Sequence, residues 1–169
     1  MSADLPELVD AWRMVASRRV FEGRRPLSAM PRLGGALLST EGEAAYVVEF
    51  GQDAFQVPFV ALRAEAGLPL QCQRSLQAFV QPVRVEQRFG LIRDEADEAA
   101  LPPGYEALLV PEDGALRPLD LVEDELILAV PLVPVAPGSE AVERDWPASA
   151  EEEAHASPFA ALAALKKQQ

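Results

Sequence analysis

One stretch decides the fold, because apolar and charged side chains alternate along it: Phe79-Val80-Gln81-Pro82-Val83-Arg84-Val85-Glu86-Gln87-Arg88-Phe89. Successive side chains of a β-strand point to opposite faces of its sheet. The apolar members Val83, Val85 and Phe89 therefore share one face, and the charged members share the other. This pattern predicts a strand of an antiparallel sheet that has one face in water.

Neighbouring stretches predict further strands. Residues 46–50 form a β-rich run that ends in a turn composition, and residues 55–64 form another, with a proline that marks an edge position or a bulge. A run over 68–73 precedes Arg74-Ser75 and the alternating stretch, which predicts a hairpin, and 105–110 predicts a short strand. No βαβ rhythm occurs, so we do not expect a parallel sheet. The expected class is α+β, an antiparallel sheet (a meander or a partly closed barrel) with a few helices and a disordered acidic C-terminal linker.

The clearest helical pattern covers residues 119–130. Its apolar residues recur at helical spacing: Leu119, Val122, Leu126 and Ala129. Its acidic residues Asp120, Glu123 and Asp124 line another side, which we expect to face solvent and to form a candidate partner surface. Pro131 ends the helix, because the residue before a proline avoids helical geometry. A strand starting at Leu126 is the competing interpretation.

A second helix is predicted near the N-terminus. Asp4 is its expected cap, Glu7 lies three residues later, and Leu8, Ala11, Trp12 and Val15 share a face. The pattern ends near Arg18-Arg19, and residues 22–35, rich in glycine and proline, are expected to be mostly loop, with room for one helical turn.

Length and composition predict one domain with an extension. The chain has 169 residues, and its apolar content suffices for one compact core. We expect a single α+β domain over residues 1–135, a flexible acidic linker over 136–157, where Pro, Gly, Ser, Ala and Glu dominate, and a short helix over 158–169. No apolar run is long enough to span a membrane and no signal peptide is recognisable, so a cytoplasmic protein is expected.

Charge is distributed unevenly. The formal net charge is −12; residues 1–93 carry eleven arginines against ten acids, whereas residues 94–153 carry seventeen acids against two arginines. The acidic part favours basic protein partners over nucleic acid, because nucleic-acid binding relies on clustered Lys and Arg. A local basic patch remains an alternative to a solvated surface, and its candidate RNA contacts are Arg18, Arg19, Arg24 and Arg25.

No motif for catalysis, cofactor binding or metal binding is present. The chain has one histidine, His155, within the predicted linker, and it lacks the glycine-rich, nucleophile-elbow and zinc-protease signatures. Runs of carboxylates on a helix face or in a loop do not provide the rigid cleft that acid–base catalysis needs. The single cysteine, Cys72, has Arg74 nearby but no general base, which favours an inert thiol. We therefore expect no enzyme, cofactor or metal.

Three stretches together resemble the YceD family, the bacterial large ribosomal RNA subunit accumulation proteins. Cys72-Gln73-Arg74-Ser75-Leu76 is similar to the family's Cys-x-Arg-Cys at a hairpin, so Cys72 and Arg74 are its motif residues here. Residues 119–134 resemble the family's most recognisable segment, and residues 157–166 resemble its terminal segment. Many members look able to build a metal or thiol site, but here Ser75, Ala136 and Ala141 stand where its other ligands are expected. The metal role is therefore not carried over.

The resemblance implies a role in the synthesis, processing or stability of large-subunit (23S) ribosomal RNA, without enzymatic activity. The leading hypothesis is a non-enzymatic ribosome-biogenesis factor that contacts ribosomal proteins or RNA-processing machinery. The alternative is direct RNA binding through the N-terminal arginines. A hydrolase that uses the carboxylates is a third and weaker hypothesis.

Overall fold

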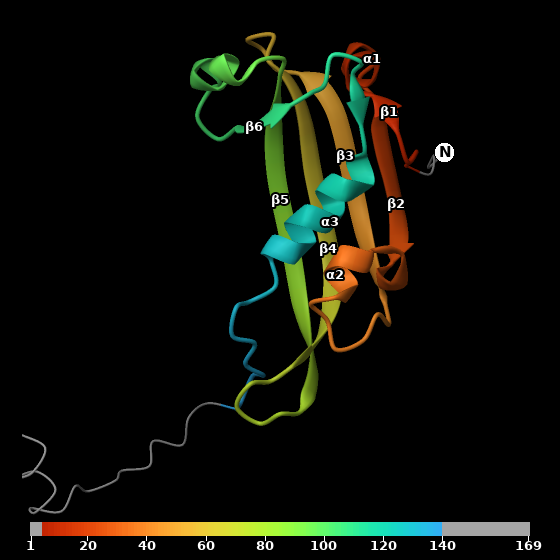
Figure 1. Ribbon diagram of the computed structural model, residues 1–169, viewed down its shortest axis with the longest axis vertical. Helices are drawn as coiled ribbons and strands as arrows, with labels where there is room; N and C mark the ends of the chain where they lie inside the picture. The colour runs from red at the N-terminus through yellow and green to blue at the C-terminus, as the bar shows by residue number, and fades with distance from the viewer. Residues whose placement is uncertain (1–4, 140–169) are drawn as a thin grey trace, which may run out of the picture. The chain divides into compact units, whose positions relative to one another are not determined.

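The computed structural model describes residues 5–139 of the chain (Figure 1). Within these residues the fold is α+β, a mixed and mostly antiparallel sheet with a few short helices, as the sequence predicts. The proposed cap Asp4, the predicted linker from residue 140 onward and the predicted helix over 158–169 lie outside the described residues. No described helix is long and apolar enough to cross a membrane.

A five-stranded sheet forms the body of the domain. Its strands follow the order β2 (Val20–Pro26), β3 (Glu43–Gln52), β4 (Pro58–Gln71), β5 (Ala78–Ile92) and β6 (Glu106–Leu109). The first four are consecutive antiparallel neighbours, so the sheet is a meander, and it stays open because β2 and β6 lie at opposite edges. The two predicted strands over 55–64 and 68–73 lie largely within the single long strand β4, which also includes the residues between them.

The sheet contains one parallel strand pair that the sequence did not predict, and the expectation of mostly loop over 22–35 is wrong for the first part of that segment. β6 runs parallel to β5, because residues 93–105 carry the chain back across the sheet end, partly as the 3₁₀ helix η2 (Glu95–Ala100). The predicted loop over 22–35 contains most of β2. Its Gly23 and Pro26 are residue types typical of turns, so the sequence does not indicate a strand. A Cβ at Gly23 would lie 2.7 Å from the hydroxyl oxygen of Tyr46 on β3, so a larger residue here would force the Tyr46 side chain to move.

The N-terminal helix begins later than predicted. Val9 and Asp10 form β1, which pairs with β7 (Ala115–Leu116), and α1 covers only Ala11–Ala16. Asp10 caps α1 by accepting the N–H of Arg13 at 3.0 Å. The prediction failed because the β1–β7 pairing, which joins residues about a hundred positions apart, keeps the preceding chain extended.

The remaining helices lie on one face of the sheet. η1 (Leu27–Ala29) and α2 (Pro31–Gly34) follow β2, and α3 (Pro118–Leu128) crosses the sheet diagonally (Figure 1). α3 confirms the predicted helix and rules out a strand from Leu126. Val122 and Leu126 of α3 are fully buried in one core with Val48 and Leu62 of the sheet. The opposite face of the sheet carries most of the charged strand residues.

Candidate functional site

The acidic side of α3 does not face solvent as a unit. Asp120 is exposed, as predicted, but Glu123 is the buried charged residue of the described domain, with an exposed fraction of 6%. Asp124 is half-buried. The prediction that all three carboxylates are solvent-facing is therefore wrong for Glu123.

Glu123 is held by the start of α2. Its Oε1 accepts the backbone N–H groups of Arg32 at 2.7 Å and Leu33 at 3.0 Å, and its Oε2 accepts Nε of Arg32 at 3.2 Å. The first N–H groups of a helix have no partner within the helix, and the residue that precedes α2, Met30, has no side-chain acceptor. The Glu123 carboxylate takes that role from α3 and so joins the two helices.

Arg32 extends this contact along α3. Its guanidinium also pairs with the carboxylate of Asp124 and donates to the carbonyl oxygen of Asp120 at 3.3 Å. Asp120 keeps its own carboxylate in solvent. The partner-surface hypothesis therefore remains a prediction that rests on Asp120 and Asp124, while Glu123 positions the helix that presents them.

The four candidate RNA contacts do not lie on one face. Arg18 occupies the turn after α1 with a φ of 47°, and the guanidinium of Arg19 lies 5.4 Å from the ring centroid of Phe21. Arg24 and Arg25 are successive residues of β2 and so point to opposite faces of the sheet. Arg25 lines a cleft beside α2 and α3, whereas Arg24 lies on the opposite face. Direct RNA contact through these arginines remains a prediction.

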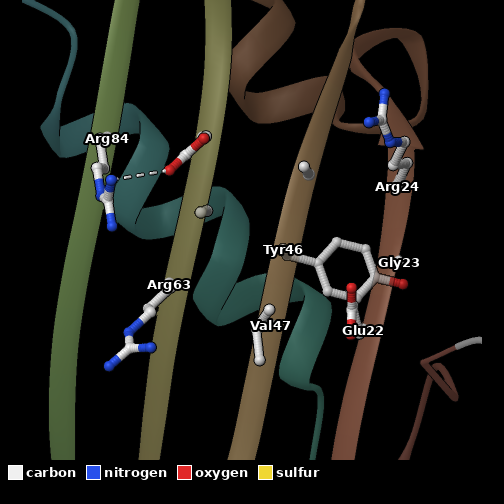
Figure 2. A pocket seen from close by; sticks show the side chains of 10 residues that line it. Glu22, Gly23, Arg24, Tyr46, Val47, Arg63 and Arg84 are labelled. Carbon is white, nitrogen blue, oxygen red and sulfur yellow. Dashed lines mark ion pairs between the residues drawn. The ribbon is translucent and has the colours of Figure 1, made fainter. Parts of the chain in front are cut away.

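The exposed face of the sheet is hollowed. Figure 2 shows Arg24, Arg63 and Arg84 reaching this face from three different strands. The hollow is about 450 Å³ in volume and opens to solvent between β2 and β5. Its arginines are paired across strands: with Glu43 (2.5 Å), Glu86 (2.6 Å) and Glu65 (3.3 Å) respectively. Because each arginine has a glutamate beside it, this face has little net attraction for a polyanion.

The predicted hairpin places Cys72 and Arg74 at one end of the domain. Cys72 is the last residue before the turn, and its buried thiol lies 3.3 Å from the hydroxyl of Ser139, beyond α3. Contacts with Ser139 and Ser75 lower the pKa of the Cys72 thiol to about 6. The guanidinium of Arg74 donates to the carbonyl of Ser139 at 3.4 Å. The hairpin motif therefore secures the chain segment that follows α3.

The residues around Cys72 do not fit a structural metal site. Ser75 donates its backbone N–H to the Cys72 sulfur at 3.4 Å, and Ala136 offers only backbone to the thiol. A structural zinc ion needs about four nitrogen or sulfur ligands. Within residues 5–139, no three His, Cys, Asp or Glu side chains are placed to hold a metal ion. Ala141, the remaining position, lies outside the described residues.

The comparisons with known proteins decide the family. The family described as "Large ribosomal RNA subunit accumulation protein YceD" matches residues 60–166, well over half of the chain. The chain belongs to the YceD family. A relative from Haemophilus influenzae, named "Large ribosomal RNA subunit accumulation protein YceD", is 29% identical over 170 residues, which cover 96% of this chain and 97% of the relative. No solved structure matches the chain.

Both segments that carried the resemblance within the described residues lie in the region that matches the family. The matched region contains the hairpin with Cys72 and the whole of α3. Sequence reasoning identified both segments but assigned Glu123 to the surface, since its partners on α2 lie about ninety positions earlier. The sequence holds one signal that Glu123 borders the core: it lies three residues before Leu126, which is buried, and residues three apart in a helix share a side.

Proposed function

We propose that this YceD protein is a non-enzymatic ribosome-biogenesis factor that supports the accumulation of large-subunit ribosomal RNA through contacts with proteins. Membership in a family of that description carries the proposal. We place its action in the cytoplasm, where it would contact ribosomal proteins or RNA-processing machinery.

The charge of the described residues favours protein contacts. The arginines of the hollowed sheet face are paired with glutamates, and the four N-terminal arginines are spread over a turn and two faces of β2. Carboxylates dominate from residue 94 onward, which suits the basic surface of a ribosomal protein. Asp120 and Asp124 belong to this acidic part and lie on α3, inside the region that matches the family.

Complementation in cells tests the proposal. Deletion of the gene should lower the ratio of large-subunit to small-subunit ribosomal RNA, and the wild-type chain should restore it. The variant Asp120→Asn/Asp124→Asn should restore it less well. A matched control, Glu95→Gln/Glu98→Gln, removes two acidic charges from exposed residues of η2 and should behave like wild type.

The outcomes separate function from surface. An unchanged ratio in the deletion strain would contradict the proposed function. A lowered ratio that both variants restore equally would keep the function and remove Asp120 and Asp124 from the partner surface. Protein levels and urea unfolding of both variants establish that any difference does not arise from loss of fold.

A further inference from the structure

Strand β5 has an open edge. It pairs with β4 over residues 78–90, but on its other side β6 pairs with residues 89–92 alone. In Figure 1, β6 lies beside one end of β5, and within the described chain no strand continues along the rest of that side. The edge of residues 78–88 is thus left without a backbone partner strand among residues 5–139.

The direction of the backbone groups follows from the strand alternation. The carbonyl of Ile92 accepts the N–H of Val110 on the β6 side, whereas the carbonyl of Gln77 accepts the N–H of Cys72 on the β4 side. Because the register has no bulge, even-numbered residues of β5 direct their N–H and C=O groups to the open edge.

Two residues, Pro82 and Arg88, limit the accessible part of this edge. Pro82 has no N–H, and its carbonyl accepts the side-chain amide of Gln81 at 3.1 Å. At the other end, the N–H of Arg88 donates to the side chain of Gln87 at 3.1 Å. Between them, the backbone groups of Arg84 and Glu86 face solvent without a partner in the described structure.

The two sides of the open edge differ in charge. On the exposed sheet face, Arg84 pairs with Glu65 at 3.3 Å and Glu86 pairs with Arg63 at 2.6 Å, so that side is neutral. On the helix side, the side-chain amide of Gln87 on β5 donates to the carboxylate of Glu106 on β6 at 2.6 Å, and the negative charge of Glu106 acts on Glu125 of α3.

The helix-side carboxylates repel one another. Burial raises the pKa of Glu125, and the negative charges of Glu106 and Asp124 raise it further. No arginine pairs with Glu106 or Glu125 among the described residues. A cation placed beside this edge would relieve the repulsion, so the edge combines unpaired strand groups with a local demand for positive charge.

We propose that the β5 edge at Arg84 and Glu86 accepts an extended segment of a basic partner protein as an added strand. The backbone of the segment would pair with Arg84 and Glu86, and alternate side chains would reach the helix side. Lys or Arg at those positions would meet Glu106 and Glu125. The inference rests on the proposed function: it names the surface through which the protein would contact its partner, and it assigns that partner a basic character.

A defined peptide tests the edge directly. The probe is acetyl-Lys-Thr-Lys-Val-Lys-Thr-Lys-Val-amide, with a control in which every Lys is Glu, and both are titrated into the full chain. Hydrogen exchange followed by NMR should show that the amides of Arg84 and Glu86 slow by at least about tenfold with the basic peptide. The acidic peptide should leave them unchanged. Absence of protection at about 1 mM basic peptide, or protection by both peptides alike, would overturn the proposal.

Paired variants separate the backbone from the side chain. Glu86→Pro and Glu86→Ala both lose the ion pair with Arg63, but only the proline removes the N–H at the open edge. Pro82 occupies a position of the same alternation four residues earlier in β5, so this strand already contains one proline whose missing N–H lies on the open edge. Glu86→Pro should bind the basic peptide at least about tenfold more weakly than Glu86→Ala. Equal affinity in folded variants would contradict the added strand.

A second variant keeps the proposal testable if Glu86→Pro fails to fold. Glu106→Gln/Glu125→Gln keeps the backbone edge and removes the charge, so it should bind the basic peptide several-fold more weakly and should lose the preference over the acidic peptide. An unchanged preference would refute the basic-partner assignment, and protection of Arg84 and Glu86 by an RNA oligonucleotide instead would replace it with an RNA site.

The cellular arm distinguishes this inference from the proposed function. Glu86→Pro should lower large-subunit ribosomal RNA relative to Glu86→Ala. If deletion lowers that RNA while both variants restore it, the function stands and the edge inference fails. If deletion leaves the RNA unchanged, the proposed function fails, and the peptide measurements decide the edge alone.

Discussion

Replacing Glu123 with alanine should strongly destabilise the domain, although its neighbour Asp120 on the same helix should tolerate change. Glu123→Ala leaves two backbone N–H groups at the start of α2 without their acceptor, and it removes one of the two carboxylates that pair with the Arg32 guanidinium, leaving Asp124. Hydrogen bonds to a charged acceptor contribute about 1.5–3 kcal/mol each, and breaking a buried ion pair costs about 3–5 kcal/mol.

The size of the effect follows from the exposure of the two partners. The Glu123 side chain is 7% exposed, but that of Arg32 is 49% exposed, so solvent retains part of the interaction of Arg32. We therefore expect Glu123→Ala to lower the free energy of unfolding by about 3 kcal/mol, in the lower part of that range. Such a loss matters, because a domain of this size has a total stability of about 5–15 kcal/mol.

Urea unfolding followed by circular dichroism measures the loss. With an m value of about 2 kcal/mol per molar urea, the midpoint of Glu123→Ala should fall by about 1.5 M. Asp120→Asn is the matched control, and it should change the free energy of unfolding by less than about 0.5 kcal/mol because its carboxylate is exposed. If Glu123→Ala unfolds at the same urea concentration as Asp120→Asn, the joint between α2 and α3 does not stabilise the fold.

Four further predictions follow from the packing, the thiol and the arginines. Leu126→Ala should lower the free energy of unfolding in urea by about 2–5 kcal/mol, because Leu126 is fully buried; a smaller loss would mean that α3 adjusts freely. Gly23→Ala should cost about 1–3 kcal/mol, and the added change Tyr46→Phe should recover part of it, unless the crowding of the Tyr46 hydroxyl is absent in solution. The fold lowers the pKa of Cys72 to about 6, from an ordinary value near 8.5. The thiolate should therefore stabilise the fold fully above about pH 8.5, and this contribution should be lost as the pH falls through 6. A difference in urea midpoint between wild type and Cys72→Ser that stays constant from about pH 5.5 to 9 would contradict this. Reversing all four N-terminal candidate arginines to Glu should abolish salt-dependent RNA binding of the isolated protein if they contact RNA; binding that ignores the change rejects that hypothesis.

The strand and helix patterns were predictable where burial alternates within one segment. The alternation around Val85 predicted β5 and its wet face, and the spacing of Val122 and Leu126 predicted α3. β2 could not be predicted in the same way, because Phe21 is its one buried side chain and Gly23 lies against Tyr46 on another strand. Local sequence patterns do not predict an element when its residues are determined by contacts with another part of the fold.

The candidate site shows the same division. The acidic side of α3 was identified from its sequence, but the role of Glu123 depends on N–H groups of α2 that no local pattern reveals. The start of α1 was misplaced for a similar reason, since Val9 pairs with Leu116, which is distant from it in the sequence. The open edge of β5 likewise depends on where β6 ends, which the strand's own sequence does not encode.

The most direct test of the central claim, that the protein supports large-subunit ribosomal RNA through protein contacts, is purification of the tagged full chain from growing cells with and without ribonuclease treatment. Ribosomal proteins or RNA-processing proteins should remain bound after the treatment and should be reduced in the Asp120→Asn/Asp124→Asn variant but not in Glu95→Gln/Glu98→Gln. Complete loss of those partners on ribonuclease treatment would contradict the claim, because the protein would then be tethered by RNA.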